Sequence, residues 1–329
     1  MHAVVIGAGI AGLATAALLG REGYEVTVVD SLDEVGGRAG SFAEDGFRWD
    51  TGPSWYLMPE AFDHFFALCG TSTEAELDLV DLSPAYRVFH GDAPVDVHSG
   101  IEEVTALFES LEPGAGDKVR QYLAQASDTY EMALKHFLYT TFSAPLNLVH
   151  RDIRTRISRL MALLTVNLKQ YVGRTFSDAR LRQILSYPAV FLSSEPAAAP
   201  ALYSLMSHTD LVEGVRYPQG GFAAVVQAIY RQAQKFGATF RLGEEVTSIK
   251  VSNRQVTGVR TNKGAIHADI VVSAAAVYHS ETQLLPPQLR TYPERYWGRR
   301  NPGLGTVLIL AGVKGKLPEL AHHTLLFSK

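Results

Sequence analysis

The chain has 329 residues, of which 47% are hydrophobic and 19% are charged, below the roughly 25% charged residues typical of soluble domains. This balance excludes global intrinsic disorder, which requires few apolar residues and many charges. The 30 basic and 34 acidic residues leave a net charge of −4, which gives no overall reason to expect nucleic-acid binding. The single cysteine, Cys69, excludes a disulfide scaffold and indicates a reducing, cytoplasmic environment. The length favours two associated domains over one.

The N-terminal residues 3–20 carry no charge, a pattern shared by membrane spans and signal peptides. No Lys or Arg precedes the stretch, and four glycines interrupt it, so a buried strand followed by a closely packed helix is the better interpretation. The predicted βαβ opening consists of a strand at 3–6, a turn at 7–12, a helix at 13–22 and a strand at 24–30.

The rest of the chain predicts a helical stretch between two β-rich stretches. After a turn-rich segment, 31–59, we expect a helix at 60–69, strands at 86–90 and 95–98, and mostly helix over 101–185. A helix to about residue 236 is followed by predicted strands at 238–242, 245–251, 256–261, 270–273 and 305–312. This order indicates a discontinuous first domain interrupted by a second.

The segment Gly7-Ala8-Gly9-Ile10-Ala11-Gly12 has the spacing GxGxxG between the first predicted strand and helix. The first glycine permits a tight turn, the second lets the backbone approach a pyrophosphate, and the third lets helix and strand pack closely. The helix N-terminus offers N–H groups and a partial positive charge to phosphates. Asp30 ends the next strand, where its carboxylate can accept hydrogen bonds from a ribose diol. Together these features predict a dinucleotide-binding site.

Two more glycine-containing segments, Gly36-Gly37-Arg38 and Gly52-Pro53-Ser54, follow the second predicted strand. A nicotinamide-binding domain does not need them at this place, whereas an extended dinucleotide can be contacted along them. Arg38 can pair with a phosphate. The alternative for Arg38 is an ordinary solvated loop cation.

Eight segments spread over the chain carry a further pattern: Val5–Leu13, Gly36–Gly40, Asp50–Ser54, Phe176–Arg182, Tyr217–Gly221, Ala268–Ser273, Leu284–Pro286 and Leu320–His323. Together they resemble the phytoene desaturase family, the bacterial-type carotenoid desaturases among the flavoproteins. The first two segments are shared with amine oxidases and specify FAD. The later segments point to the desaturase branch.

The resemblance implies an α/β fold in which a Rossmann-like FAD-binding domain, amine-oxidase-like in type, is interleaved with a mixed α+β substrate domain. It implies that residues 1–75 and 217–275 form the FAD-binding domain, and that 76–216 and 276–329 form the substrate and membrane-associating domain. Gly52-Pro53-Ser54 would lie near the isoalloxazine, and the backbone of Val246 against the adenine. The implied FAD-binding residues are Gly7, Gly9, Ile10, Ala11, Gly12, Asp30, Gly36, Gly37, Arg38, Gly52, Pro53, Ser54 and Val246.

The activity that the resemblance implies is an FAD-dependent desaturation in carotenoid biosynthesis, which introduces C=C bonds into phytoene or a related isoprenoid by hydride transfer to flavin. Alternatives on the same fold are an amine or porphyrinogen oxidase, a retinoid oxidoreductase, and a non-catalytic prenyl-binding protein. The intact glycine turn argues against the last of these, because such binding proteins typically have a degraded turn.

The sequence departs from the family's pattern in two ways. Ala274-Ala275-Ala276 stands where an Asn/Gly-Ala-Asp step is common, so these side chains offer no polar contact. Family members are also longer and have a glycine-rich C-terminal segment that closes over the cofactor. We therefore expect the chain to be a fragment.

A basic segment lies within this acidic chain, with eight Lys and Arg and two acids between Arg151 and Arg182, a local net charge of +6. On a helix, five apolar residues would share one face and three basic residues the opposite face: Ile153, Ile157, Leu160, Leu164 and Leu168 against Arg151, Arg159 and Lys169. A basic amphipathic helix over Arg151–Lys169 can lie on an anionic membrane, which predicts peripheral membrane association. An ordinary core-facing helix with a solvated charged face gives the same pattern.

No Cys or His cluster has ligand spacing, so no metal site is expected. Cys69 has no identifiable base, and Gly-x-Ser-x-Gly is absent, so hydrolysis has no support. Flavin chemistry needs the substrate C–H placed against the cofactor and water excluded, so no catalytic residue is assigned. The sequence does not fix the oligomeric state.

Overall fold

The computed structural model describes residues 1–91, 93–140 and 150–327, and the chain divides into two compact units. The first contains Met1–Val80, Tyr217–Asn301 and Leu310–Gly312, and the second contains Asp81–Arg216, Pro302–Ile309 and Val313–Lys329. The chain leaves the first unit at Val80, where the sequence placed a boundary at 75, and returns at Tyr217. Residues 276–301, placed in the second domain by sequence, fall in the first unit, because Leu284 packs among Val4 and Val246.

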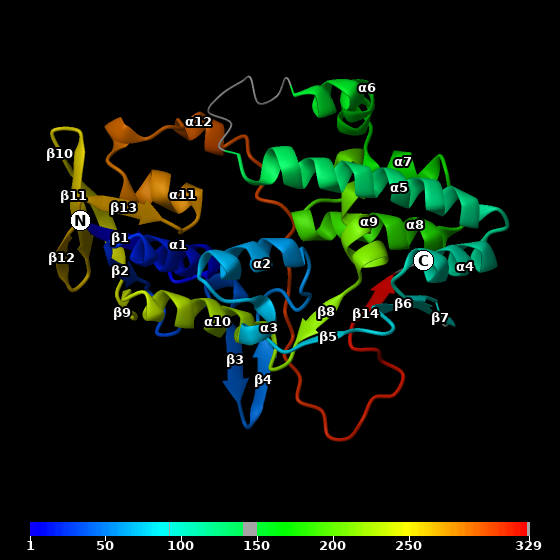
Figure 1. The fold of residues 1–329 in the computed structure, drawn as a ribbon, viewed down its shortest axis with the longest axis horizontal. Coiled ribbons are helices and arrows are strands. Elements are labelled where there is room, and N and C mark those ends of the chain that lie inside the picture. Colours follow the sequence, from blue (N-terminus) through cyan, green and yellow to red (C-terminus); the bar gives the residue numbers. More distant parts are fainter. Residues whose placement is uncertain (92, 141–149, 328–329) are drawn as a thin grey trace. The chain divides into compact units, whose positions relative to one another are not determined.

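The first unit is built on a parallel four-stranded sheet in the order β13-β1-β2-β9 (Figure 1). These strands are β1 (His2–Ile6), β2 (Glu25–Val29), β9 (Thr239–Arg241) and β13 (Ile270–Ser273). Helix α1 (Ile10–Arg21) connects β1 to β2, so the uncharged N-terminal stretch is the predicted strand and helix. No helix in the described part of the chain is both long and apolar enough to cross a membrane.

Side chains on the two faces of this sheet alternate, as the two-residue period of a strand requires. Val5 and Val28 pack with residues of α1 and α10 (Phe222–Lys235) on one face. Val4, Ile6 and Val29 pack on the other face against the antiparallel sheet β10-β11-β12. Burial on both faces explains why β1 is an unbroken apolar run.

Smaller elements complete the first unit. A hairpin within the predicted turn-rich segment leads through a loop to α2. These elements are β3 (Ser41–Glu44), β4 (Phe47–Asp50), α2 (Pro59–Leu68), α3 (Thr73–Glu76), β10 (Val246–Ser252), β11 (Gln255–Thr261), β12 (Gly264–His267), α11 (Val277–His279) and α12 (Glu294–Trp297). The chain crosses between the units at β5 (Leu79–Asp81) and β8 (Arg216–Pro218).

The second unit is mainly helical, with a three-stranded sheet in the order β14-β6-β7. Its strands are β6 (Tyr86–His90), β7 (Ala93–Val97) and β14 (Thr324–Phe327), and its helices are α4 (Ile101–Leu111), α5 (Ala115–Ala133), α6 (Arg151–Thr165), α7 (Leu168–Gly173), α8 (Ala179–Ser186) and α9 (Met206–His208). A π-helical turn, Leu134–Leu138, extends α5. The prediction of a strand at 305–312 is wrong, because this segment has no regular structure. Val307 and Ile309 are exposed, and no strand among the described residues pairs with the segment.

An ionisable residue, Asp210, lies in the core of the second unit. Its Oδ2 accepts hydrogen bonds from the hydroxyls of Tyr86 (3.2 Å) and Tyr187 (2.9 Å). Its Oδ1 is buried and has no hydrogen-bond partner among the described residues. Burial raises the pKa of Asp210 to about 7, against the opposing effect of the two tyrosine hydroxyls.

Helix α6 differs from the predicted amphipathic helix. It ends at Thr165, and Leu168 begins the separate helix α7. Ile153 and Leu160 are buried against Met132 of α5, but Ile157 and Leu164 are exposed. The prediction that Leu168 shares this helix is therefore wrong, and the other four apolar residues are divided between buried and exposed positions. Arg156 and Arg159 form ion pairs with Asp128 of α5, which fix how α6 lies against that helix.

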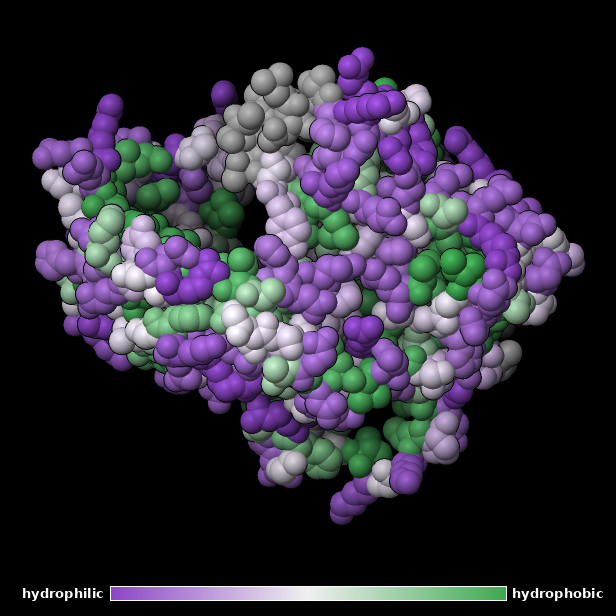
Figure 2. Space-filling model, in the orientation of Figure 1, coloured by the Kyte–Doolittle hydropathy of each residue, from purple (hydrophilic) through white to green (hydrophobic). Residues whose placement is uncertain are grey.

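Exposed hydrophobic residues occur elsewhere on the surface too. Figure 2 shows separate hydrophobic patches within a largely hydrophilic face. Scattered patches are ordinary for folded proteins, so exposure alone does not identify a functional surface.

Candidate cofactor site

The GxGxxG segment lies at the carboxyl ends of β1 and β2, the edge at which open α/β sheets bind ligands. The Gly7 N–H donates to the Val29 carbonyl at 2.8 Å, which ties the turn to the end of β2. Helix α1 begins at Ile10, inside the turn, earlier than the predicted start at residue 13. Its N-terminus therefore points out of the glycine segment itself.

Two of the three glycines are required by the protein's own packing. Gly7 has φ +101°, a conformation that side chains rarely tolerate. A Cβ on Gly12 would lie 1.8 Å from the Gly7 carbonyl oxygen and 3.3 Å from the Ala274 Cβ. These residues hold the turn, the helix and the segment after β13 together, and a small residue at 274 is part of that contact.

Gly9 is different, because no contact with another described residue requires a glycine there. Its backbone is extended, with φ −74° and ψ 177°, and the nearest atom to an added Cβ is the Gly36 carbonyl oxygen at 3.7 Å. Gly9 caps α1 without a side-chain hydrogen bond, and the first turn of α1 contains no acidic residue among those described. The half-buried backbone at Gly9 and the uncompensated helix N-terminus suit an anionic phosphate.

Asp30 lies beside this turn. Its Oδ2 accepts a hydrogen bond from the Ala8 N–H at 2.6 Å, and its Oδ1 accepts one from the Leu32 N–H at 2.9 Å. Each carboxylate oxygen keeps further acceptor capacity, because a carboxylate has about four lone-pair sites. The carboxylate is therefore fixed in orientation at the edge of the phosphate turn, where a ribose diol can donate to it.

The second glycine segment packs directly against the first. The Gly36 N–H donates to the Ala8 carbonyl at 2.9 Å, and an added Cβ on Gly37 would lie 3.3 Å from the Gly9 Cα. Arg38, in the same short helical turn, is exposed and has no ion-pair partner within the described residues. Arg38 thus stands on a segment that packs against the glycine turn, and its guanidinium can pair with a phosphate.

The third segment continues this line of contact. A Cβ on Gly52 would lie 2.0 Å from the Arg38 carbonyl oxygen, so only glycine fits. Pro53 is exposed and Ser54 is half-buried. Asp50, just before this segment, accepts hydrogen bonds from the N–H groups of Phe222 and Ala223 and so caps α10.

Val246 begins β10, on the other side of Asp30. The Glu244 N–H donates to the Asp30 carbonyl at 2.9 Å, and the Asn262 N–H donates to the Glu245 carbonyl. The pair Val246 and Thr261 is therefore in the non-hydrogen-bonded position of the ladder, so the Val246 backbone polar groups point away from β11. This orientation leaves them able to face a base.

Every residue predicted to bind the cofactor lies in the first unit, on three glycine segments and two strand ends. The polar groups at the site are backbone N–H groups and a guanidinium, which donate hydrogen bonds, and the Asp30 carboxylate, which accepts them. Sequence reasoning missed Asp50, although the motif Asp50–Ser54 was singled out. An acid that caps a helix more than 170 residues later has no local signal.

Comparison with known proteins identifies the family of the chain. Residues 10–310 match the family model described as flavin containing amine oxidoreductase. The chain is 36% identical to the carotenoid 3,4-desaturase of Haloarcula japonica over 98% of its own length and 65% of that protein. It is also 36% identical to the phytoene dehydrogenase of Streptomyces griseus, over 99% of its own length and 63% of that protein. The resemblance to carotenoid desaturases is thus confirmed, and the chain spans slightly less than two thirds of these relatives.

Among solved structures, a putrescine oxidase superimposes with a TM-score of 0.58 at 18% sequence identity, covering 90% of this chain and 62% of that protein. At that identity the likeness shows the fold, and it confirms the expected Rossmann-like flavoprotein architecture. The half-buried backbone of Gly9, the N-terminus of α1 and the exposed Arg38 fit the diphosphate of the FAD cofactor of this fold. The chain belongs to the flavin-containing amine oxidoreductase family.

Proposed function

We propose that this chain binds FAD and substrate for a desaturase reaction that introduces C=C bonds into phytoene or a related carotenoid or isoprenoid. The observation that carries the proposal is the open backbone at Gly9, which no packing contact explains and which a bound pyrophosphate does. The carotenoid desaturases among its relatives supply the substrate class.

When bound, FAD would accept a hydride from an allylic C–H of the substrate. The chain's own residues bind and orient. Gly9 and the N-terminus of α1 would hold the pyrophosphate, Asp30 would hold the ribose, and the Val246 backbone would contact the adenine. Gly52-Pro53-Ser54 would contact the isoalloxazine, and the second unit would supply the apolar substrate site.

The test combines the visible spectrum of bound flavin with a measurement of phytoene desaturation. Purified protein is mixed with FAD, freed of excess cofactor and examined for retained flavin absorbance, then incubated anaerobically with phytoene in liposomes. Retained flavin that is bleached as conjugated products form supports the proposal. Flavin retention with bleaching by an amine, a porphyrinogen or a retinoid, but not by phytoene, would contradict the substrate. No flavin retention would contradict the cofactor role of this chain.

The proposal includes contact with a membrane through α6, because so apolar a substrate must be drawn from a bilayer. Three hydrophobic side chains, one turn apart on the outer side of α6, are about half exposed: Ile157 (51%), Met161 (52%) and Leu164 (50%). Arg151 and Arg154 lie exposed at the N-terminal end of the helix and make no ion pair with a described residue. An apolar stripe flanked by free arginines is suited to the interface of an anionic bilayer.

The alternative is a core-facing helix with a solvated charged face. It accounts for Arg156 and Arg159, which pair with Asp128, but not for the exposed apolar stripe. Membrane contact through α6 predicts that the charges of Arg151 and Arg154 and the apolar side chains of the stripe both contribute to vesicle binding.

Co-sedimentation with vesicles containing an anionic phospholipid separates the two interpretations. Reversing Arg151 and Arg154 to Glu should weaken binding by at least about tenfold, at about 1 kcal/mol per basic residue. Replacing Ile157 and Met161 by Ser should weaken it on neutral vesicles too. Arg174→Glu, at an exposed arginine outside α6, is the matched control. Equal binding of all variants would refute membrane contact through α6.

A further inference from the structure

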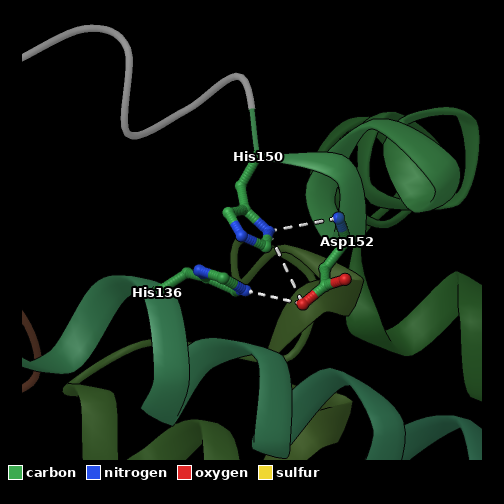
Figure 3. Close-up of side chains that lie close together, drawn as sticks. All are labelled: His136, His150 and Asp152. Atoms are coloured by element: carbon green, nitrogen blue, oxygen red, sulfur yellow. Dashed lines mark hydrogen bonds and ion pairs between the residues drawn. The ribbon is translucent and has the colours of Figure 1, made fainter.

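Two histidines and an aspartate that lie apart in the sequence meet at one end of α6. His136 is in the π-helical turn that extends α5, and His150 and Asp152 are at the N-terminus of α6 (Figure 3). His136 Nε2 lies 3.2 Å from Asp152 Oδ2, and His150 Nδ1 lies 3.6 Å from the same oxygen. The two imidazole rings lie with their centroids 4.5 Å apart. All three side chains therefore converge on one point between the two elements.

The spacing of these atoms is that of a metal coordination sphere. One ligand atom from each residue lies within 4.8 Å of the others. A first-row divalent metal bonds nitrogen and oxygen at about 2.1 Å, which places neighbouring ligand atoms of a tetrahedral site about 3.4 Å apart. The two nitrogen–oxygen separations, 3.2 Å and 3.6 Å, bracket that value, and the ligand nitrogens of the two histidines lie within 4.8 Å of each other, so small ring movements would complete the geometry.

The chemistry of the donors is equally suitable. Two imidazoles and a carboxylate favour Zn²⁺, Cu²⁺ or Ni²⁺ over the hard cations Mg²⁺ and Ca²⁺. The His136 side chain is 10% exposed, whereas those of His150 and Asp152 are 51% and 36% exposed. The site is thus anchored on its inner side and open on its outer side, where water can complete the coordination.

Lys135 supplies a cation to the cluster in the metal-free protein. Its Nζ donates to Asp152 Oδ2 at 2.9 Å, and its side chain is 65% exposed. A divalent ion would displace the exposed ammonium of Lys135 from Asp152. It would also replace the long hydrogen bond, 3.3 Å, that the Asp152 N–H donates to His150 Nδ1.

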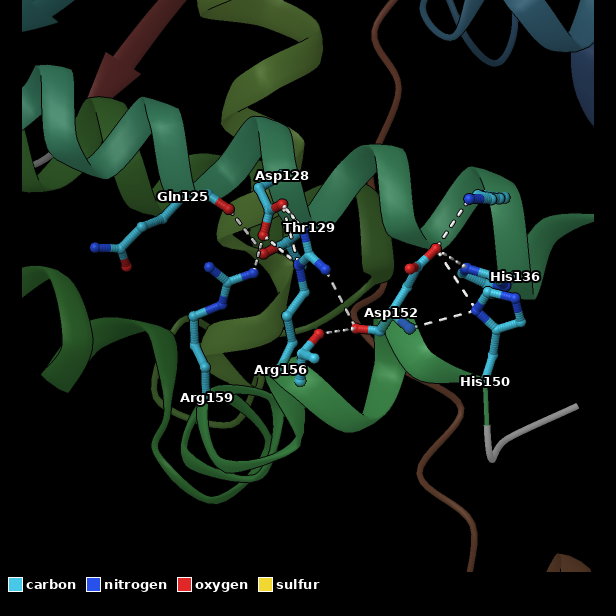
Figure 4. Close-up of polar contacts among 10 residues, drawn as sticks. Gln125, Asp128, Thr129, His136, His150, Asp152, Arg156 and Arg159 are labelled. Atoms are coloured by element: carbon cyan, nitrogen blue, oxygen red, sulfur yellow. Dashed lines mark hydrogen bonds and ion pairs between the residues drawn. The ribbon is translucent and has the colours of Figure 1, made fainter.

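A separate network positions the cluster without help from a metal (Figure 4). Arg156 donates to Asp128 Oδ1 at 2.6 Å and to the Asp152 carbonyl at 3.3 Å, and Arg159 pairs with the other oxygen of Asp128. These contacts fix the first turns of α6 against α5. The backbone that carries Asp152 is therefore held in place, and a cavity of about 210 Å³ lined by His136 and Asp152, but not by His150, lies beside the cluster.

We infer that His136, His150 and Asp152 form a binding site for a divalent transition-metal ion of the Zn²⁺ class. The ion would join the end of α5 to the start of α6, the helix that carries the exposed apolar stripe. The site is distinct from the cofactor site and does not depend on the proposed desaturase activity.

The test uses the full chain with Zn²⁺ and Cu²⁺ salts. One equivalent of Cu²⁺ should bind, with electron paramagnetic resonance couplings from two nitrogens, and Zn²⁺ should raise the unfolding temperature. His136→Gln, His150→Gln and Asp152→Asn should each weaken binding by more than about tenfold, and each histidine variant should lose one nitrogen coupling. His150→Gln, at an exposed position, is the variant least able to disturb the fold.

Two further variants make the test decisive. His267→Gln changes an exposed histidine on β12 and should leave the affinity unchanged. Lys135→Gln removes the competing ammonium and should tighten binding severalfold, whereas a purely structural ion pair would give only a less stable protein. Binding that is equally strong in the His136 and His150 variants, or weakened equally by His267→Gln, would show adventitious histidine binding and overturn the site.

Discussion

A Cβ on Gly12 would lie 1.8 Å from the carbonyl oxygen of Gly7, so the first turn of α1 packs directly on the glycine turn that precedes it. Gly9, between them, has no such contact, since the nearest atom to its added Cβ is 3.7 Å away. The same motif therefore contains glycines required by folding and a glycine that leaves room for a ligand.

Gly12→Ala should destabilise the apoprotein, because the added methyl overlaps a backbone atom that cannot move without opening the turn. The expected loss is about 1–3 kcal/mol of unfolding free energy, the usual range for overpacking, measured by denaturant titration without FAD. Gly173→Ala, at the end of α7 with nothing within 4 Å, is the control and should be neutral or slightly stabilising. An unchanged midpoint for Gly12→Ala would be incompatible with the packing described.

Gly9→Ala should have the opposite profile. The added methyl fits the chain, so unfolding free energy should stay within about 0.5 kcal/mol of the parent value. It would occupy the space of the pyrophosphate, so FAD affinity should fall by at least about tenfold, or about 1.4 kcal/mol. Fluorescence titration with FAD measures this. Undiminished affinity would show that the phosphates do not lie against Gly9.

Features of the fold that depend on residues adjacent in the sequence, or on the burial of a whole strand or helix, could be predicted from the sequence. The apolar run at β1 and the glycine turn were identified because a strand buried on both faces and a positive φ each leave a local signal. The orientation of α6 could not be predicted, because it is set by Asp128 on a different helix. The contact between His136 and Asp152 could not be predicted either, because the two residues lie on different elements, on either side of residues 141–149.

The Asp128 ion pairs should contribute to stability in a pH-dependent way. Arg156 and Arg159 hold the pKa of Asp128 at about 2, below its ordinary value of 3.8. A lowered pKa stabilises the fold above the unfolded value, and that contribution is lost as the pH falls from about 4 to 2. Asp128→Asn should therefore cost about 1 kcal/mol at pH 7 and progressively less toward pH 2.

Chemical denaturation at several pH values measures the Asp128 contribution. Glu131→Gln, which removes an exposed charge from the same helix, is the matched control. A cost for Asp128→Asn that is constant from pH 7 to 2 would mean that the ion pairs do not account for it.

Asp210 should have the reverse pH dependence. Its pKa in the folded protein, about 7, is above the ordinary value of 3.8, because burial disfavours the carboxylate. The folded state then binds the proton more tightly than the unfolded state, so stability should decrease as the pH rises from about 4 to 7 and level off above. Asp210→Asn keeps an acceptor for Tyr86 and Tyr187 but cannot ionise, so this decrease in stability should disappear in the variant. The difference in unfolding free energy should be at most about 4 kcal/mol at pH 7 and above.

Unfolding measured from pH 4 to 8 tests the role of Asp210, with Asp117→Asn as the exposed control. If the unfolding free energy of the parent protein rises from pH 4 to 8, and Asp210→Asn has the same pH dependence, Asp210 is a carboxylate in the folded protein. That result would contradict a carboxylic acid between the two tyrosines.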